Sequence, residues 1–215
     1  MESTVYKELS LLQVEALVPS LVAMLLCVAL AASNHPHGIP VIMNHYLSQL
    51  DSLEQKIQWI EYTRNGIFKS IVLCGGPRVI NAEIIMYDSL PAEYKPLLRT
   101  FALSQNASEL DTRGMNFFHQ VYGTNSQDKQ QLIETSSSDV WYFVKYVYSS
   151  IVSDMTWLNP VETELEVIVS LIQMDTLQQL QDHRLGAKRV GATEEQIKAA
   201  EYIGYQVKQK VHSLK

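Results

Sequence analysis

The residues best placed for chemistry are an acid and a histidine in the last third of the chain, Glu164 and His183. Thr176 and Gln179 precede His183, and at about 100° per residue all three share one face of a helix. Glu164 lies twelve residues before Thr176, so a helical hairpin could bring its carboxylate to the imidazole. Because an imidazole exchanges its proton near neutral pH, the pair predicts general acid–base chemistry.

Other interpretations of these residues stay open. A carboxylate–imidazole pair also occurs as a purely structural hydrogen bond in a core. Arg113 is polar within an apolar stretch and could hold a carboxylate ligand, although a structural ion pair is favoured. The loop histidines His35, His37 and His45 lack a partner at metal-ligand spacing, so we expect no metal there. No cofactor motif is recognised, and no cofactor is expected.

Local signals around the acid and the histidine predict the helices that position them. Asn159-Pro160-Val161-Glu162 combines an N-cap, a proline at the first helical position and a glutamate at the third. Asp175 or Thr176 begins the next helix, which places Thr176 near an N-terminus that favours anions. Gly191 ends that helix, and Thr193 opens a capping box for the last one.

The rest of the chain is also predicted to be helical. The uncharged run from Ala16 to Ala32 reads as a buried central helix, because it is short for a membrane span. A long helix is predicted from Val41 to Leu73, with an interruption near Asn65-Gly66 left open, and Gly75-Gly76-Pro77 begins the next one. The aromatic-rich stretch from Asp139 to Ser153 is predicted to be core or a subunit interface. We therefore expect an all-α fold.

Composition excludes several classes of protein. The 215 residues carry a net charge of −6, which argues against a nucleic-acid partner. Cys27 and Cys74 are too few for a disulfide scaffold and read as buried small side chains. No signal or transit peptide is recognised, so we expect an intracellular protein, cytoplasmic first, with the mitochondrion or peroxisome as alternatives. The letters of Ser213-Leu214-Lys215 are in the wrong order for a peroxisomal address.

The segment 164–197 resembles the signature of the carboxymuconolactone decarboxylase family. Its alkylhydroperoxidase-D-like branch has the motif Glu-x11-Cys-x2-Cys-x3-His, and the spacing of Glu164, Thr176, Gln179 and His183 matches it. The signature region spans 150–212, and the resemblance extends over most of the chain after Ala16. The elements that extend it, typical of eukaryotic and largely fungal members, are Arg64, Lys69, Gly76-Pro77, Ile80-Asn81-Ala82, Arg113-Gly114 and Tyr122-Gly123.

The resemblance implies a single helical-bundle domain over 1–215, built of two related helical-hairpin halves. It also implies a homo-oligomer with a small-molecule site near a subunit boundary. Thr176 and Gln179 stand where the peroxidase branch has cysteines, and neither can cycle through sulfenic acid and disulfide, so peroxidase activity should be absent. Three functions remain open, of which a membrane-anchored protein that uses the run from Ala16 to Ala32 is the least favoured. The other two are non-redox acid–base chemistry by Glu164 and His183 on a small carbonyl or carboxylate, and a helical scaffold without chemistry.

Overall fold

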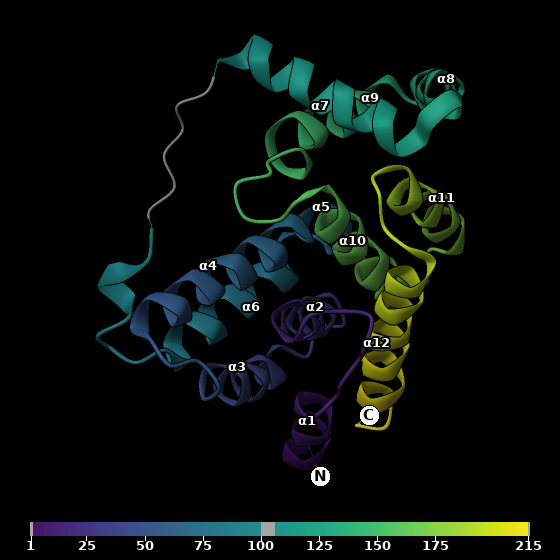
Figure 1. Cartoon of the computed structure of the whole chain (residues 1–215). Coiled ribbons are helices and arrows are strands. Elements are labelled where there is room, and N and C mark those ends of the chain that lie inside the picture. The colour runs from purple at the N-terminus through teal and green to yellow at the C-terminus, as the bar shows by residue number, and fades with distance from the viewer. Residues whose placement is uncertain (1, 100–105, 215) are drawn as a thin grey trace.

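The computed structural model describes residues 2–99 and 106–214, which form helices joined by short turns (Figure 1). No strand occurs within these two ranges, so the predicted all-α fold is confirmed. The α-helices are α1 (Glu2–Ser10), α2 (Pro19–Ala32), α3 (Ile39–Leu47), α4 (Leu53–Lys69), α5 (Ile71–Cys74), α6 (Gly76–Ser89), α7 (Ala107–Tyr122), α8 (Ser126–Ser136), α9 (Ser138–Val147), α10 (Pro160–Met174), α11 (Leu177–Arg189) and α12 (Glu194–His212). The shorter turns are η1 (Pro36–Gly38), η2 (Lys95–Leu97), η3 (Gly123–Asn125) and the π-turn η4 (Tyr148–Val152).

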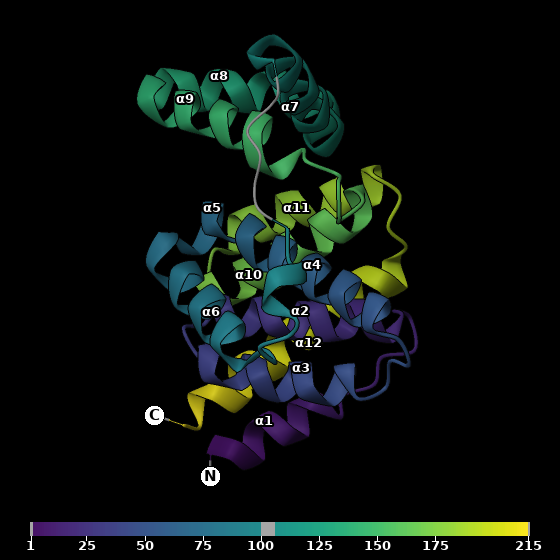
Figure 2. The same ribbon diagram turned by 90° about the vertical axis from the view of Figure 1, so that its left-hand side faces the viewer.

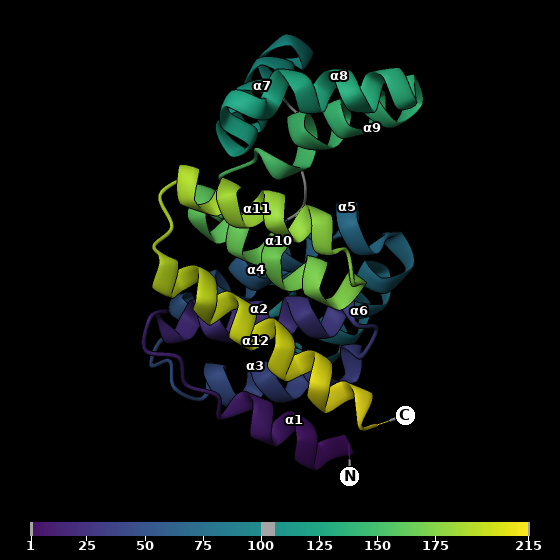
Figure 3. The same cartoon turned by 90° about the vertical axis from the view of Figure 1, so that its right-hand side faces the viewer.

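Helix α2 is the centre of the main hydrophobic core. Every residue from Leu21 to Ala32 is buried, and α3, α4, α10 and α12 pack around this helix (Figure 3). The uncharged run therefore faces protein on all sides, which explains why it is apolar all round rather than on one stripe. Within the described ranges, no helix combines the length and the apolar character that crossing a membrane requires.

The predicted caps at the C-terminal helices are confirmed. The Asn159 side chain accepts from the Glu162 amide at 3.0 Å, and Glu162 accepts from the Asn159 amide at 2.9 Å. Thr193 opens α12 with the same reciprocal pair. Gly191 has a φ of 109°, which a residue without a Cβ adopts freely, so α11 ends there and the chain turns into α12.

Helices α7, α8 and α9 form a lobe with its own small core, above α11 in Figure 2. α7 packs on both α11 and η4. The approach is close, because a Cβ on Gly114 would lie 2.4 Å from the Ser149 Cα atom. The buried residues of this lobe core are Phe117, Phe118, Val121, Trp141, Val147, Tyr148 and Val152.

The predicted long helix from Val41 to Leu73 is wrong. The chain leaves the helical path after α3, and Ser52 begins α4 with a capping box. The Ser52 hydroxyl accepts from the Gln55 amide at 3.1 Å, and Gln55 accepts from the Ser52 amide at 3.1 Å. The Ser-x-x-Gln signal was present in the sequence, and it outweighs the apolar periodicity because it satisfies amides that a helix start leaves free.

Candidate functional site

The hairpin of α10 and α11 joins the predicted acid and histidine. Asp175 takes a left-handed conformation with a φ of 57°, and Thr176 is the N-cap of α11, so the two helices turn back on each other within two residues. Glu164 and His183 then meet, with 2.9 Å between Oε2 and Nδ1. The Glu164 side chain is fully buried and that of His183 is 9% exposed. The predicted pairing is therefore present.

A glycine and an aromatic ring beside Glu164 and His183 allow the surrounding helices to pack closely around the pair. Gly186 follows His183 by one turn, and a Cβ at that position would lie 2.7 Å from Glu164 Oε2 and 2.7 Å from Val121 Cγ1. The missing side chain lets α11 approach both α10 and α7. From α7, Tyr122 contacts the imidazole edge-on, with 5.9 Å between ring centroids. The pair thus lies where three helices meet.

The hydrogen bond determines how the imidazole can act. If Nδ1–H donates to the Glu164 carboxylate, Nε2 of the neutral ring carries the free lone pair. The described residues offer Nε2 no hydrogen-bond partner. They also leave Glu164 Oε1 buried without a donor. The arrangement is a carboxylate-oriented imidazole, which can accept a proton at Nε2 while the acid keeps the ring in position.

Thr176 and Gln179 are less closely connected to the pair. Thr176 is half-buried, and its hydroxyl donates to the Leu171 carbonyl at 3.4 Å. Gln179 is exposed, one turn before His183 on α11. No hydrogen bond between described residues joins either of them to His183. Their role beside a ligand stays a prediction.

Arg113 lies on α7 and binds the π-turn η4. Its Nε donates to Ser153 Oγ at 3.0 Å, and its Nη2 donates to the Ser149 carbonyl at 3.1 Å. These bonds fasten the lobe to the segment that leads into α10. The geometry supports the structural interpretation of Arg113, and its role as a ligand for a carboxylate stays a prediction.

A buried lysine that the sequence reasoning did not include among the site residues lies on the other side of α10. Lys69 ends α4 and is 1% exposed. Its Nζ donates to Thr163 Oγ1 at 2.8 Å and to the Val152 carbonyl at 3.0 Å. Burial lowers the pKa of Lys69 to about 8. The negative charge of Glu166 acts in the opposite direction and is the largest of the effects that raise this pKa. Its position between Phe68 and an apolar run was the only sequence signal for burial.

Glu166 is the second buried acid of α10. Its Oε1 accepts from Ser170 Oγ at 3.0 Å, whereas Oε2 has no donor among the described residues. Burial raises the pKa of Glu166 to about 8, and the Ser170 hydroxyl and Lys69 oppose that shift. Two acids two residues apart on one helix therefore have different partners: an imidazole for Glu164, and a hydroxyl with a nearby ammonium for Glu166.

Neither cysteine is placed for thiol chemistry. Cys27 lies in the centre of α2 and Cys74 at the end of α5, and both are buried, as predicted. Burial raises the pKa of both thiols, and a high thiol pKa keeps sulfur in the unreactive protonated form.

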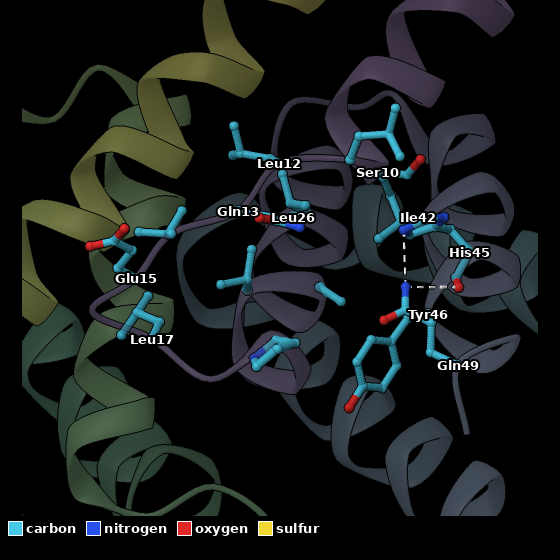
Figure 4. Close-up of a pocket in the computed structure, with 15 residues that line it drawn as sticks. Ser10, Leu12, Gln13, Glu15, Leu17, Leu26, Ile42, His45, Tyr46 and Gln49 are labelled. Carbon is cyan, nitrogen blue, oxygen red and sulfur yellow. Dashed lines mark hydrogen bonds between the residues drawn. The ribbon is translucent and has the colours of Figure 1, made fainter. Parts of the chain in front are cut away.

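Three of the cavities among the described residues stand out, and none of these three is lined by Glu164, His183 or Arg113. The largest, about 630 Å³, lies between α2, α3 and the segment 10–17 (Figure 4). Its wall includes His45, whose Nε2 and carbonyl are 3.0 and 3.3 Å from Gln49 Nε2. The second has about 550 Å³ and lies between α4 and α6, and the third, about 210 Å³, lies by Arg78 and Lys208. The Glu164–His183 pair is enclosed instead by its neighbours, since its two side chains are 0% and 9% exposed.

Comparison with known proteins gives two relatives. Peroxisomal protein 2 of Schizosaccharomyces pombe is 31% identical over 184 residues, which cover 84% of this chain and 82% of that protein. The chain belongs to the Peroxisomal protein 2 family. Peroxisomal protein 2 of Saccharomyces cerevisiae is 24% identical over 170 residues, which cover 68% of this chain and 60% of that protein. Both relatives are fungal, which fits the predicted fungal relationship.

Membership of the Peroxisomal protein 2 family does not itself assign a reaction. No family model matches the chain, and no solved structure matches it. The likeness to carboxymuconolactone decarboxylases therefore rests on the sequence motifs alone, chiefly the segment 164–197 with the spacing of Glu164 and His183.

Proposed function

We propose that this member of the Peroxisomal protein 2 family uses His183 as a general base, oriented by Glu164, on a small carbonyl or carboxylate compound. The observation that carries the proposal is the 2.9 Å contact between Glu164 Oε2 and His183 Nδ1, with no partner for Nε2 among the described residues. The carboxylate holds the imidazole in one orientation and leaves its Nε2 lone pair available to accept a proton.

The proposed step is a proton transfer. A C–H bond next to a carbonyl breaks, its proton goes to His183 Nε2, and its electron pair forms the enolate. Glu164 retains the hydrogen bond from Nδ1–H and stabilises the imidazolium. Return of the proton to a different atom, or its exchange with water, regenerates the neutral ring. The step needs no oxidant and no thiol.

The resemblance to carboxymuconolactone decarboxylases supports the same chemistry. The acid and the histidine are kept at the family's spacing, while Thr176 and Gln179 replace both cysteines of the peroxidase branch. Because neither replacement can form a sulfenic acid, we propose that the protein is inactive as a peroxidase.

A deuterium-exchange experiment tests the general base. The protein is incubated in D₂O with pyruvate, acetoacetate and γ-butyrolactone, and proton NMR follows loss of the signals next to each carbonyl. We expect catalysed exchange with at least one compound, and a drop of about 10²–10⁴-fold in the His183→Gln variant. His119→Gln is the matched control, because His119 is exposed on α7. Exchange that survives His183→Gln would refute the proposal.

The second candidate is a scaffold that assembles with a second copy of itself. The closed surroundings of His183 favour it, and so does α9, which leaves Tyr142, Phe143 and Tyr146 between 52% and 73% exposed. Exposed aromatic side chains on one helix are typical of an interface. Mass photometry should show a homo-oligomer that dissociates when Tyr142 and Tyr146 are both changed to Ser. A monomeric wild-type chain would rule out the oligomer, and no exchange with any of the three compounds would favour the scaffold over the enzyme.

We further propose a peroxisomal location, which the names of both relatives support. An N-terminal fluorescent fusion expressed in yeast, viewed beside a peroxisomal matrix marker, tests this. A uniform cytoplasmic signal would contradict the proposal.

A further inference from the structure

The second cavity, between α4 and α6, has the features of a ligand site distinct from the Glu164–His183 pair. These helices lie side by side (Figure 1), and its volume of about 550 Å³ is typical of small-molecule sites. Four of its wall residues recur at helical spacing on one face of α4, and the others come from α6 and from the second residue after η2. The wall consists of Glu61, Arg64, Asn65, Phe68, Glu83 and Arg99.

The charges of this wall are unevenly paired. Glu61 is buried and receives Arg64 Nη1 at 3.2 Å and the backbone amide of Arg99 at 2.7 Å. Its second oxygen lies 3.5 Å from Arg99 Nε. Glu83 has one long contact, 3.4 Å from its Oε2 to Arg64 Nε, and its Oε1 is buried without a donor. Glu61 thus pairs with two guanidinium groups, whereas one oxygen of Glu83 has no hydrogen-bond donor.

Asn65 provides the second unpartnered acceptor. The residue is 5% exposed, yet its Oδ1 has no donor among the described residues. A buried amide oxygen without a donor is unfavourable, so a ligand that supplies the missing hydrogen bond would bind more tightly. Phe68, 38% exposed, adds an apolar surface to the same cavity.

We propose that this cavity binds a small organic monocarboxylate that also carries a hydroxyl group. The ligand carboxylate accepts from Arg64 and Arg99, which keep guanidinium N–H groups beyond those that Glu61 and Glu83 use. The ligand hydroxyl donates to Asn65 Oδ1, and the hydrocarbon part packs on Phe68. A neutral Glu83 donates a hydrogen bond to the bound carboxylate and keeps its proton, so the incompletely paired acid gains a partner.

The balance of charge explains why one negative charge fits. Burial raises the pKa of Glu83 to about 7, while Arg64 opposes the shift and Glu61 adds to it. These two groups on α4, with Arg99 across the cavity, are the charges that face Glu83 from the cavity wall. With Glu83 neutral, two guanidinium groups and one carboxylate remain, a net charge of +1 that a monocarboxylate neutralises.

Titration calorimetry with mandelate, an aromatic hydroxycarboxylate, tests the proposal. We expect mandelate to bind wild-type protein at pH 6, and to bind about tenfold more weakly at pH 8, where Glu83 has lost its proton. Mandelamide, which has the same shape without the charge, should not bind. In Glu83→Gln the affinity should be the same at both pH values.

Two arginine variants keep the test decisive if one of them fails to fold. Arg64→Met and Arg99→Met should each weaken mandelate binding at least tenfold, whereas Arg184→Met, on α11 and paired with Glu201 at 3.1 Å, should leave it unchanged. No heat with mandelate at pH 6, equal binding of mandelamide, or an affinity insensitive to both arginine variants would overturn the proposal. None of these outcomes alters the deuterium-exchange test of His183. The proposal for this cavity and the proposal for His183 are therefore tested independently.

Discussion

Two regions of the molecule hold a buried carboxylate in different surroundings. Glu164 and Glu83 each have one oxygen bound to a nitrogen and a second oxygen buried without a donor. Around Glu164, α7, α10 and α11 pack closely on Gly186. Around Glu83, α4 and α6 enclose about 550 Å³ of space. An unpartnered carboxylate oxygen is therefore found both at a tightly packed helix junction and in a residue that lines a cavity.

The difference comes from what separates the helices. A glycine with no Cβ allows α11 to approach the Glu164 carboxylate. The wall between α4 and α6 instead carries two arginines and two glutamates, whose long charged side chains line the cavity. A buried ionisable residue is therefore a weak indicator of a binding site until the space around it is known.

The largest expected effect is at Glu166, the buried acid two residues after Glu164 on α10. The folded pKa of about 8 lies above the unfolded value near 4.5, so the folded protein holds the extra proton between these values. Wild-type stability should therefore fall as pH rises through that window, and Glu166→Gln should remove the fall. Between pH 5 and pH 8 the variant should gain up to about 4 kcal/mol relative to wild type.

Urea unfolding at both pH values measures this gain. Glu134→Gln is the control, because Glu134 is exposed on α8, and it should leave the pH dependence unchanged. If the free energies of unfolding of Glu166→Gln and wild type differed by the same amount at pH 5 and pH 8, the raised pKa of Glu166 would be contradicted.

The next effect concerns the close packing that distinguishes the surroundings of Glu164. Gly186→Ala should lower the free energy of unfolding by about 2–3 kcal/mol, because the new Cβ meets both Glu164 and Val121. Gly76→Ala is the matched control at the start of α6, since a Cβ there has nothing within 4 Å. Thermal unfolding should separate the two variants, and equal melting temperatures would show that the contact at Gly186 is not tight.

The smallest effect is at Glu83. Its folded pKa of about 7 also lies above the unfolded value, so wild-type stability should fall with rising pH between about 4.5 and 7. Glu83→Gln should gain about 1–2 kcal/mol over this window, less than Glu166→Gln, because the Glu83 side chain is 28% exposed and water screens it. A larger gain at Glu83 than at Glu166 in urea unfolding would reverse the contrast between the regions.

Short-range signals predicted much of the fold and part of the candidate site. The caps at Asn159 and Thr193 and the glycine at Gly191 act within four residues, so the amino-acid order suffices to find them. The spacing between Glu164 and His183 predicted their contact because a helical hairpin brings such positions together. The break at Ser52 was missed because a strong apolar period hid a short capping signal.

The sequence did not reveal the buried polar residues Lys69, Glu83 and Asn65. The partners of Lys69 are Val152 and Thr163, more than eighty residues away along the chain, and Arg99 reaches Glu61 across 38 positions. Contacts of this range depend on how whole helices pack, which local propensities do not encode.

The sequence by itself determined an all-helical chain, its central apolar helix and an acid and a histidine at hairpin spacing. Only the tertiary structure decided that this pair is closed in by Gly186 and Tyr122, and that a cavity opens between α4 and α6 instead. The physical reason is that helix formation and capping depend on neighbours along the chain. Burial, proton affinity and empty space depend on which distant side chains meet.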